Sequence, residues 1–373
     1  MSELFSNVTN INIQMIIMWC IGGLLIFLAI KKDMEPSLLL PMGFGAILVN
    51  LPFSGAVNQA INGVIEEGPI DTLFNMGIAN ELFPLLLFVG IGAMIDFAPL
   101  LSNPKMMLFG AAAQFGIFFT LSMAVLFGFD LKDAASIGII GAADGPTSIF
   151  VANFFKSNYL GAIIVAAYSY MALVPIVQPP VIRLITTKKE RSIKMEYSQK
   201  EISKTTKILF PIIVTVVTGI IAPKSVALVG FLMFGNLIRE CGVLNSLSET
   251  AQKTLANLIT LFLGITVATK MQYESFLNKE TLLILGLGLI AFIFDTAGGV
   301  FFAKIINIFS KKKINPMVGA AGISAFPMSA RVINKMGLAE DPTNFLLMHA
   351  VGANVSGQIA SVIAGGLIMN LIG

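Results

Sequence analysis

The stretch Gly138–Ala152, GIIGAADGPTSIFVA, places one carboxylate, Asp144, inside an otherwise apolar run. Helix breakers flank this acid, with Gly141 before it and a Gly-Pro pair at 145–146 after it. A carboxylate at the centre of a bilayer costs roughly 2.5–3.5 kcal/mol, so such residues are rare and usually functional. Broken backbone at membrane depth is tolerated only inside protein or beside a cavity. The stretch therefore predicts an ion or substrate site on an interrupted helix; the alternative is a loop Asp that caps a helix between two spans.

The composition indicates a polytopic membrane protein of the all-α class. The chain has 373 residues, of which 56% are hydrophobic and only 12% are charged, whereas soluble domains carry roughly 25% charged residues. Several apolar runs approach the roughly 20 residues that span a bilayer. The net charge of +3 gives no reason to expect a nucleic-acid partner.

The few sulfur and imidazole side chains do not form a recognisable metal or disulfide pattern. Cys20 and Cys241 are far apart, and His349 is the only histidine. We interpret His349 as a polar residue at the end of a span.

About ten membrane spans are expected, together with two shorter interrupted segments. The expected spans are 13–30, 37–51, 82–101, 106–128, 159–184, 208–222, 226–239, 254–271, 281–309 and 343–371. The interrupted segments, 134–156 and 314–336, read as re-entrant hairpins made of broken helices.

Basic residues set the expected orientation. The hydrophilic stretch 186–207 is strongly basic, and further Lys runs stand at 31–32 and 311–313. The positive-inside rule puts all three in the cytoplasm. This orientation requires the hairpins 134–156 and 314–336 to enter from opposite faces. It divides the chain into a first membrane repeat, 1–185, a basic cytoplasmic linker, 186–207, and a second repeat, 208–373.

Short internal matches support a relation between these halves. The segment 87–91, LFVGI, matches 261–265, LFLGI, and both hairpins contain GAA, at 141–143 and 319–321. The same order in both halves predicts two inverted-topology repeats, which place their ion and substrate sites near the membrane midplane where broken helices meet.

The second hairpin and the last span supply polar residues for such a site. Ser324 lies where the second hairpin breaks, and Asn354 lies in a Gly-rich span. Hard cations prefer several oxygen ligands, so we expect Asp144, Ser324 and Asn354 to bind Na⁺. Arg331 either neutralises Asp144, holds a substrate carboxylate, or extends to the cytoplasmic surface.

The sequence leaves several polar residues with two interpretations. Ser356 and Gln358 either bridge helices or join the site. Asp295, in a Gly-rich setting, is either a second ion ligand or a helix-packing device. Asp96 is interpreted as interfacial.

Three long motifs resemble a known family. GAADGPTSIFVANFF (141–155), INPMVGAAGISAFPMSARV (314–332) and HAVGANVSGQIASVIAGG (349–366) are similar to the beta subunit of the sodium-pumping biotin-dependent decarboxylases. These enzymes act on oxaloacetate, methylmalonyl-CoA or glutaconyl-CoA. Functional positions of that family match Asp144, Tyr170, Asn315, Ser324, Arg331 and Asn354, with Tyr168 beside them as a further candidate.

The resemblance implies a multi-pass subunit of a bacterial or archaeal inner membrane that decarboxylates carboxybiotin, consumes a proton and exports sodium ions. Biotin would come from a separate carrier and carboxyltransferase subunit, because no biotin carrier domain is recognisable in this sequence. A small membrane subunit and a homotrimeric assembly are also implied. The chain has no Gly-rich phosphate loop followed by Lys-Ser/Thr, so ATP is not expected as the energy source.

The resemblance also suggests a chemical hypothesis. Asp144 would alternate between a sodium-bound carboxylate and a protonated acid, Arg331 would hold the substrate carboxylate, and Tyr170 would relay a proton. The alternative function is a sodium-coupled secondary transporter of a small carboxylate, in which Arg331 would bind the solute.

Overall fold

The computed structural model describes residues 8–32, 34–61, 64–196 and 201–373. Nearly all of these residues are helical or lie in connecting turns. Strands β1 (Gln59–Ile61) and β2 (Val64–Glu66) form one short antiparallel hairpin. The predicted all-α class is confirmed, and the β-hairpin is a local addition that was not predicted.

The helices of the first half follow the predicted apolar runs, with additional breaks. They are α1 (Ile13–Lys32), α2 (Pro36–Val49), α3 (Pro69–Gly77), α4 (Leu82–Met94), α5 (Ala98–Ser102), η2 (Pro104–Met106), α6 (Met107–Ala113), α7 (Phe115–Leu126), α8 (Leu131–Gly138), η3 (Ile139–Ala142), α9 (Gly145–Phe154) and α10 (Leu160–Ile185).

The second half repeats this mixture of long and interrupted helices. Its elements are α11 (Lys188–Arg191), α12 (Lys204–Ile221), η4 (Pro223–Ser225), α13 (Val226–Glu240), α14 (Asn245–Thr250), η5 (Ala251–Leu255), α15 (Ala256–Val267), η6 (Ala268–Met271), α16 (Tyr273–Phe276), α17 (Lys279–Phe309), α18 (Met317–Ala320), α19 (Met328–Glu340) and α20 (Leu347–Ile372).

Within the described residues, seven helical segments are long and apolar enough to cross a membrane. The bent pair α3 and α4, which meet at 65°, brings the number to eight if it is counted as one span. This composition fits a polytopic membrane protein. The predicted total of ten spans remains a prediction, because α2 and α13 are shorter than a full crossing.

Some predicted spans are interrupted. The run 82–101 is divided between α4 and α5, and the side chain of Asp96 accepts the Ala98 N–H in the gap (2.9 Å). The run 106–128 is divided at Gln114, whose amide nitrogen donates to the carbonyl of Gly110 (2.9 Å). Hydropathy does not distinguish a straight helix from a broken one, because the side chains on both sides of each break are apolar.

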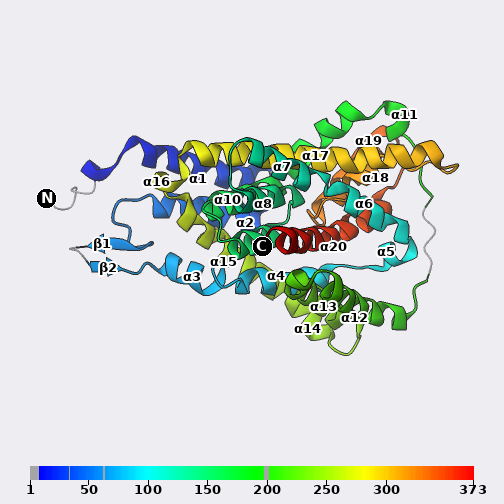
Figure 1. Ribbon diagram of the computed structural model, residues 1–373, viewed down its shortest axis with the longest axis horizontal. Helices are drawn as coiled ribbons and strands as arrows, with labels where there is room; N and C mark the ends of the chain where they lie inside the picture. Colours follow the sequence, from blue (N-terminus) through cyan, green and yellow to red (C-terminus); the bar gives the residue numbers. More distant parts are fainter. Residues whose placement is uncertain (1–7, 33, 62–63, 197–200) are drawn as a thin grey trace.

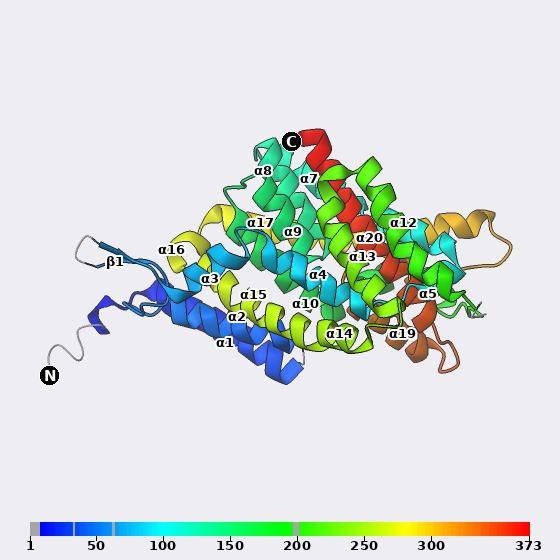
Figure 2. The same cartoon turned by 90° about the horizontal axis from the view of Figure 1, so that it is seen from below.

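The long helices enclose the two interrupted segments. Helix α17 runs along one long side of the molecule (Figure 1) and packs against α7, α10 and α18. Helix α20 packs against α6, α9 and α19, and Figure 2 shows it passing through the middle of the helical body. The segments around η3 and α18 therefore lie inside the protein, where broken backbone is tolerated.

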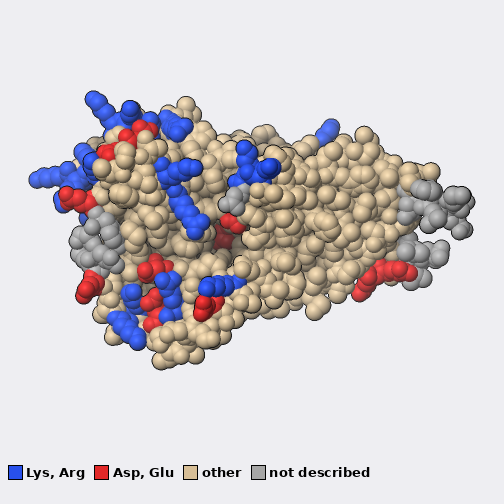
Figure 3. Space-filling view, turned by 180° about the vertical axis from the view of Figure 1, so that it is seen from behind, with Lys and Arg blue, Asp and Glu red and all other residues tan. Residues whose placement is uncertain are grey.

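Basic side chains gather at the end of the molecule opposite β1 and β2 (Figure 3). The first part of the predicted linker docks there. Arg191 pairs with Glu340 (2.6 Å), and Lys194 pairs with Asp341 (3.1 Å). These ion pairs join the described part of the linker to the C-terminal end of α19.

Candidate functional site

The first break is built by the residues around Asp144. The 3-10 turn η3 ends at Ala142, and Ala143 has a left-handed backbone (φ 52°). Asp144 is extended and caps α9, with Pro146 in the first turn of that helix, where the missing N–H of proline costs no helical hydrogen bond. Helix α9 therefore begins at the Gly-Pro pair, immediately after Asp144.

The second break lies directly against the first. The N–H of Ser324 donates to the carbonyl of Ala142 (3.2 Å), so backbone groups freed by one break are satisfied by the other. The segment between α18 and α19, which contains Ser324, is buried almost throughout. Two segments that are far apart in sequence thus form one centre.

Hydroxyl and amide groups surround the Asp144 carboxylate, which is 3% exposed. Thr147 donates to its Oδ2 atom at 2.6 Å, and Ser361 donates to the same atom at 3.4 Å. The side chain of Gln358 also forms a hydrogen bond with Asp144. These donors orient the carboxylate but bring no positive charge.

Helix α20 also holds the second break. The Asn354 amide nitrogen donates to the Ile323 carbonyl (2.6 Å), and the Ser324 hydroxyl donates to the Gly357 carbonyl (2.9 Å). The amide oxygen of Asn354 is buried and has no hydrogen-bond partner among the described residues. Helix α20 thus contacts Asp144 through Ser361 and the second break through Asn354 and Gly357, and Asn354 keeps a free acceptor among the described residues.

The charge of Asp144 is not balanced by a side chain. None of the ion pairs formed by the described residues includes Asp144. Buried charges in proteins are normally paired or bind a metal ion. The centre is therefore chemically suited to a proton or a small cation on the carboxylate.

Two predicted site residues lie elsewhere in the hydrogen-bond network. Arg331 is exposed and forms no ion pair within the described part of the chain, so the structure does not join it to Asp144. Asn315 is buried and its amide nitrogen donates to the carbonyls of Arg191 (2.7 Å) and Ile193 (2.9 Å). Asn315 connects the second hairpin to the linker.

The two tyrosines of α10 have different partners. The hydroxyl of Tyr170 donates to the backbone carbonyl of Leu285 in α17. Tyr168 is buried, and its ring packs on Gly145, the residue after Asp144.

Asp295 and Ser356 make packing contacts close to the breaks. Asp295 accepts the N–H of Gly116, the second residue of α7, at 2.5 Å, and its other oxygen lies against Gly141. Ser356 donates to the carbonyl of Met106 (2.9 Å). Asp295 thus caps a helix from a neighbouring span, and Ser356 joins α20 to the start of α6.

Thr147 and Ser361 are partners of Asp144 that were not predicted from the sequence, and Gln358 was predicted only to bridge helices or to join the site. A helical pattern could have identified them. Thr147 is three residues after the capping Asp144, and Gln358 and Ser361 follow Asn354 at i+4 and i+7 on one helix face.

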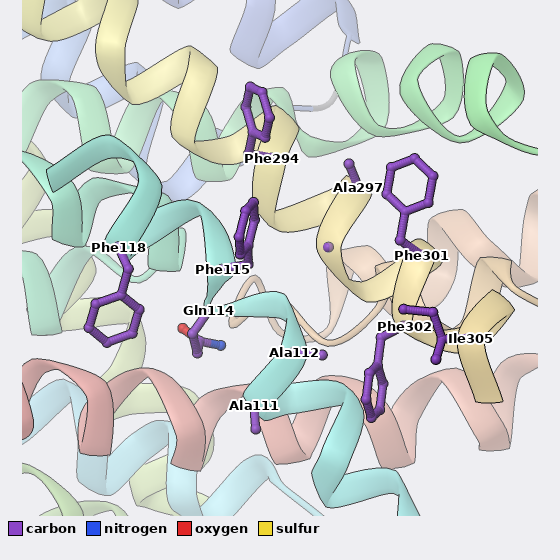
Figure 4. Close-up of a pocket in the computed structure, with 11 residues that line it drawn as sticks. Ala111, Ala112, Gln114, Phe115, Phe118, Phe294, Ala297, Phe301, Phe302 and Ile305 are labelled. Carbon is purple, nitrogen blue, oxygen red and sulfur yellow. The ribbon is translucent and has the colours of Figure 1, made fainter. Parts of the chain in front are cut away.

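An apolar cavity of about 650 Å³ lies apart from this centre, between α6, α7 and α17. Figure 4 shows the rings of Phe115, Phe294 and Phe302 around it, with Gln114 at the break between α6 and α7. Asp144 does not line this cavity, so the cavity is not part of the polar centre.

Comparison with known proteins decides the family. The family described as Na⁺-transporting oxaloacetate decarboxylase beta subunit matches residues 14–372. The chain belongs to this family. The predicted resemblance is therefore confirmed across nearly the whole sequence.

Individual relatives within this decarboxylase family are similar over nearly their full lengths. The methylmalonyl-CoA decarboxylase subunit beta of Propionigenium modestum is 49% identical, covering 98% of this chain and 96% of the relative. The glutaconyl-CoA decarboxylase subunit beta of Acidaminococcus fermentans is 47% identical (96% and 93% covered). The oxaloacetate decarboxylase beta chain of Klebsiella pneumoniae is 43% identical (95% and 94% covered). These relatives are thus decarboxylase beta subunits whose names differ in the substrate, which is either oxaloacetate or an acyl-CoA.

Proposed function

We propose that this beta subunit decarboxylates carboxybiotin presented by a partner subunit and uses the reaction to export sodium ions. Family membership supports the decarboxylase and the sodium transport. The observation that carries the site proposal is a buried Asp144 without a cationic partner, bonded to helix α20, which also carries the unpaired amide oxygen of Asn354. That combination is suited to a small cation.

Sodium is the cargo in this proposal. Asp144, Ser324 and Asn354 supply oxygen atoms to it, because a hard monovalent cation prefers such ligands. Asn315, also predicted to bind sodium, acts here through the linker, since its amide nitrogen is used by the carbonyls of Arg191 and Ile193.

The proton balance links decarboxylation to transport. The N–CO₂⁻ bond of carboxybiotin breaks, carbon dioxide leaves, and the biotin nitrogen gains a proton. Asp144 supplies that proton and then binds sodium as a carboxylate, because a cation and a proton compete for the same oxygens. Arg331 holds the incoming carboxylate at the cytoplasmic side, and Tyr170 relays the proton.

The architecture in this proposal is a pair of inverted repeats, 1–185 and 208–373, joined by the cytoplasmic linker 186–207. The contact between Ser324 and Ala142 supports the meeting of their two hairpins. Biotin belongs to a separate carrier and carboxyltransferase subunit. A small membrane subunit completes the complex in the inner membrane of a bacterium or archaeon, and the beta subunit forms a homotrimer.

The alternative is a sodium-coupled transporter of a small carboxylate that uses the same centre. The exposed position of Arg331 is compatible with either substrate. The two functions differ in whether carbon dioxide is released.

The experiment measures carbon dioxide release from a carboxylated carrier by the purified complex, with and without sodium, for wild type and Asp144→Asn. Sodium-stimulated release that is lost in Asp144→Asn is the expected result. Full activity in the variant would refute the role of Asp144. No release by the wild type, together with sodium-dependent carboxylate uptake into vesicles, would establish the transporter instead.

A further inference from the structure

We propose that the hydroxyl of Tyr168 is an additional oxygen ligand of the cation at Asp144. The inference rests on the proposed sodium site and adds a residue to it. It assigns to Tyr168 a role distinct from that of Tyr170, the tyrosine that the family resemblance identifies.

The ring of Tyr168 is pressed against the first break. A Cβ atom added to Gly145 would lie 2.2 Å from Cε1 of Tyr168 and 2.3 Å from Cζ. Cζ is the ring carbon that carries the hydroxyl, and Gly145 directly follows Asp144. Because Gly145 has no side chain, the edge of the ring that carries the hydroxyl lies against the start of α9.

The hydroxyl of Tyr168 has no partner in the described structure. Tyr168 is 1% exposed, and its hydroxyl oxygen is buried without a hydrogen bond among the described residues. A buried tyrosine hydroxyl usually has a polar partner, because leaving it unpaired is unfavourable. The charge of Asp144 lies within electrostatic range of this phenol. A cation bound at Asp144 would supply the missing partner.

Tyr170 cannot replace Tyr168 in this role. It is two residues further along α10, which rotates it by roughly 200° around the helix. Its hydroxyl donates to the carbonyl of Leu285, and its ring packs beside Gly288 of α17. Tyr168 instead belongs to a buried cluster with residues of α2, α9 and α15. The two phenols therefore face different sides of α10.

A phenol is a neutral ligand, which determines its expected effect. It strengthens cation binding without changing the number of negative charges or the group that carries the proton. Loss of its oxygen should weaken sodium binding and leave the rate at saturating sodium nearly unchanged.

The test is Tyr168→Phe, which keeps the ring on Gly145 and removes only the oxygen. Tyr159→Phe is the matched control, because Tyr159 precedes α10 and its ring packs edge-on against Phe129, away from Asp144. Sodium titrations of carbon dioxide release and of thermal stabilisation are measured for both variants. Tyr168→Phe should raise the sodium concentration for half-maximal effect on the order of tenfold, as expected for one lost polar contact, and Tyr159→Phe should match wild type.

A second measurement does not depend on the variant folding. 3-Fluorotyrosine placed at residue 168 in otherwise native protein should show a ¹⁹F shift on addition of sodium, and the same label at residue 159 should not. Unchanged sodium affinity in Tyr168→Phe, or no ¹⁹F response at residue 168, overturns the inference. If one of these two results is found while wild type still responds to sodium and Asp144→Asn does not, only the role of Tyr168 is refuted. If wild type does not respond to sodium, the proposed function fails as well.

Discussion

At the scale of single residues, the centre depends on uncharged donors around one buried acid. Thr147 and Ser361 both donate to Oδ2 of Asp144, and no described ion pair involves that acid. Hydrogen bonds to an ionised group contribute about 1.5–3 kcal/mol each. The carboxylate is thus held in position while its charge remains available to a cation.

Removing the shorter of these bonds should weaken sodium binding. Thr147→Val keeps the shape of the side chain and removes the hydroxyl that lies 2.6 Å from Asp144. We expect the sodium concentration for half-maximal decarboxylation to rise by about tenfold or more, since 1.4 kcal/mol corresponds to a factor of ten. Thr147→Ser, which retains the hydroxyl, is the control. Equal sodium affinity in the Val and Ser variants would contradict this role.

At the scale of elements, α20 and α7 show how broken helices are stabilised from outside. Helix α20 bonds to both breaks through Ser361, Asn354 and the carbonyl of Gly357. Helix α7 begins at the break after Gln114, and Asp295 of α17 accepts one of its first N–H groups. The breaks at Asp144, Ser324 and Gln114 are therefore each stabilised by hydrogen bonds with another span.

The capping role of Asp295 predicts a difference between two substitutions. Asp295→Asn keeps an oxygen acceptor for the Gly116 N–H, whereas Asp295→Ala leaves that buried donor unpaired at a cost of about 1–3 kcal/mol. The Ala variant should unfold at a clearly lower temperature than the Asn variant when thermal unfolding is followed in detergent. Similar unfolding temperatures for both variants would show that the cap does not stabilise α7.

Docking of the linker predicts a pH dependence outside the membrane. Hydrogen bonds from Thr343 and, to a smaller extent, the interaction with Lys194 lower the pKa of Asp341 from 3.8 to about 2. Because the folded-state pKa is the lower one, the stabilisation by Asp341 is present above about pH 4 and is lost as the pH falls toward about 2. The unfolding temperature of wild type should exceed that of Asp341→Asn slightly at pH 6, since exposed pairs contribute little. This difference should disappear in acid; a difference that persists below pH 2 would refute the assignment.

At the scale of the whole molecule, charge separates the two ends. Lys and Arg gather at the end opposite the β-hairpin (Figure 3). The positive-inside rule predicts that this end faces the cytoplasm. The same prediction puts the linker and the β-hairpin on opposite sides of the membrane.

Single cysteines test this orientation. In a background without Cys20 and Cys241, Glu67→Cys beside the β-hairpin should react with a membrane-impermeant thiol reagent in intact cells. Glu196→Cys in the linker should react only after the membrane is opened. Both residues are exposed, so accessibility alone does not distinguish them. Labelling of Glu196→Cys in intact cells would reverse the orientation.

The sequence alone was sufficient to predict the all-α membrane architecture and the decarboxylase family. Both depend on local properties, namely long apolar runs and three contiguous motifs. The interruption at Asp144 was also predictable, because a Gly-Pro pair lies beside the acid and restarts α9. The grouping of Asp144 with Ser324 and Asn354 followed from residue type and from the repeat.

Only the tertiary structure decided which of these side chains are satisfied and by which partners. In the tertiary structure the run 106–128 is divided at Gln114, where Asp295 of α17 caps the second part. The hydroxyl of Tyr170 points toward α17, and that of Tyr168 is buried beside the break. These outcomes depend on contacts between segments that lie more than a hundred residues apart, such as Ser361 with Asp144. Hydropathy and spacing describe one segment at a time, so they cannot specify which backbone group or side chain of another segment completes a hydrogen bond.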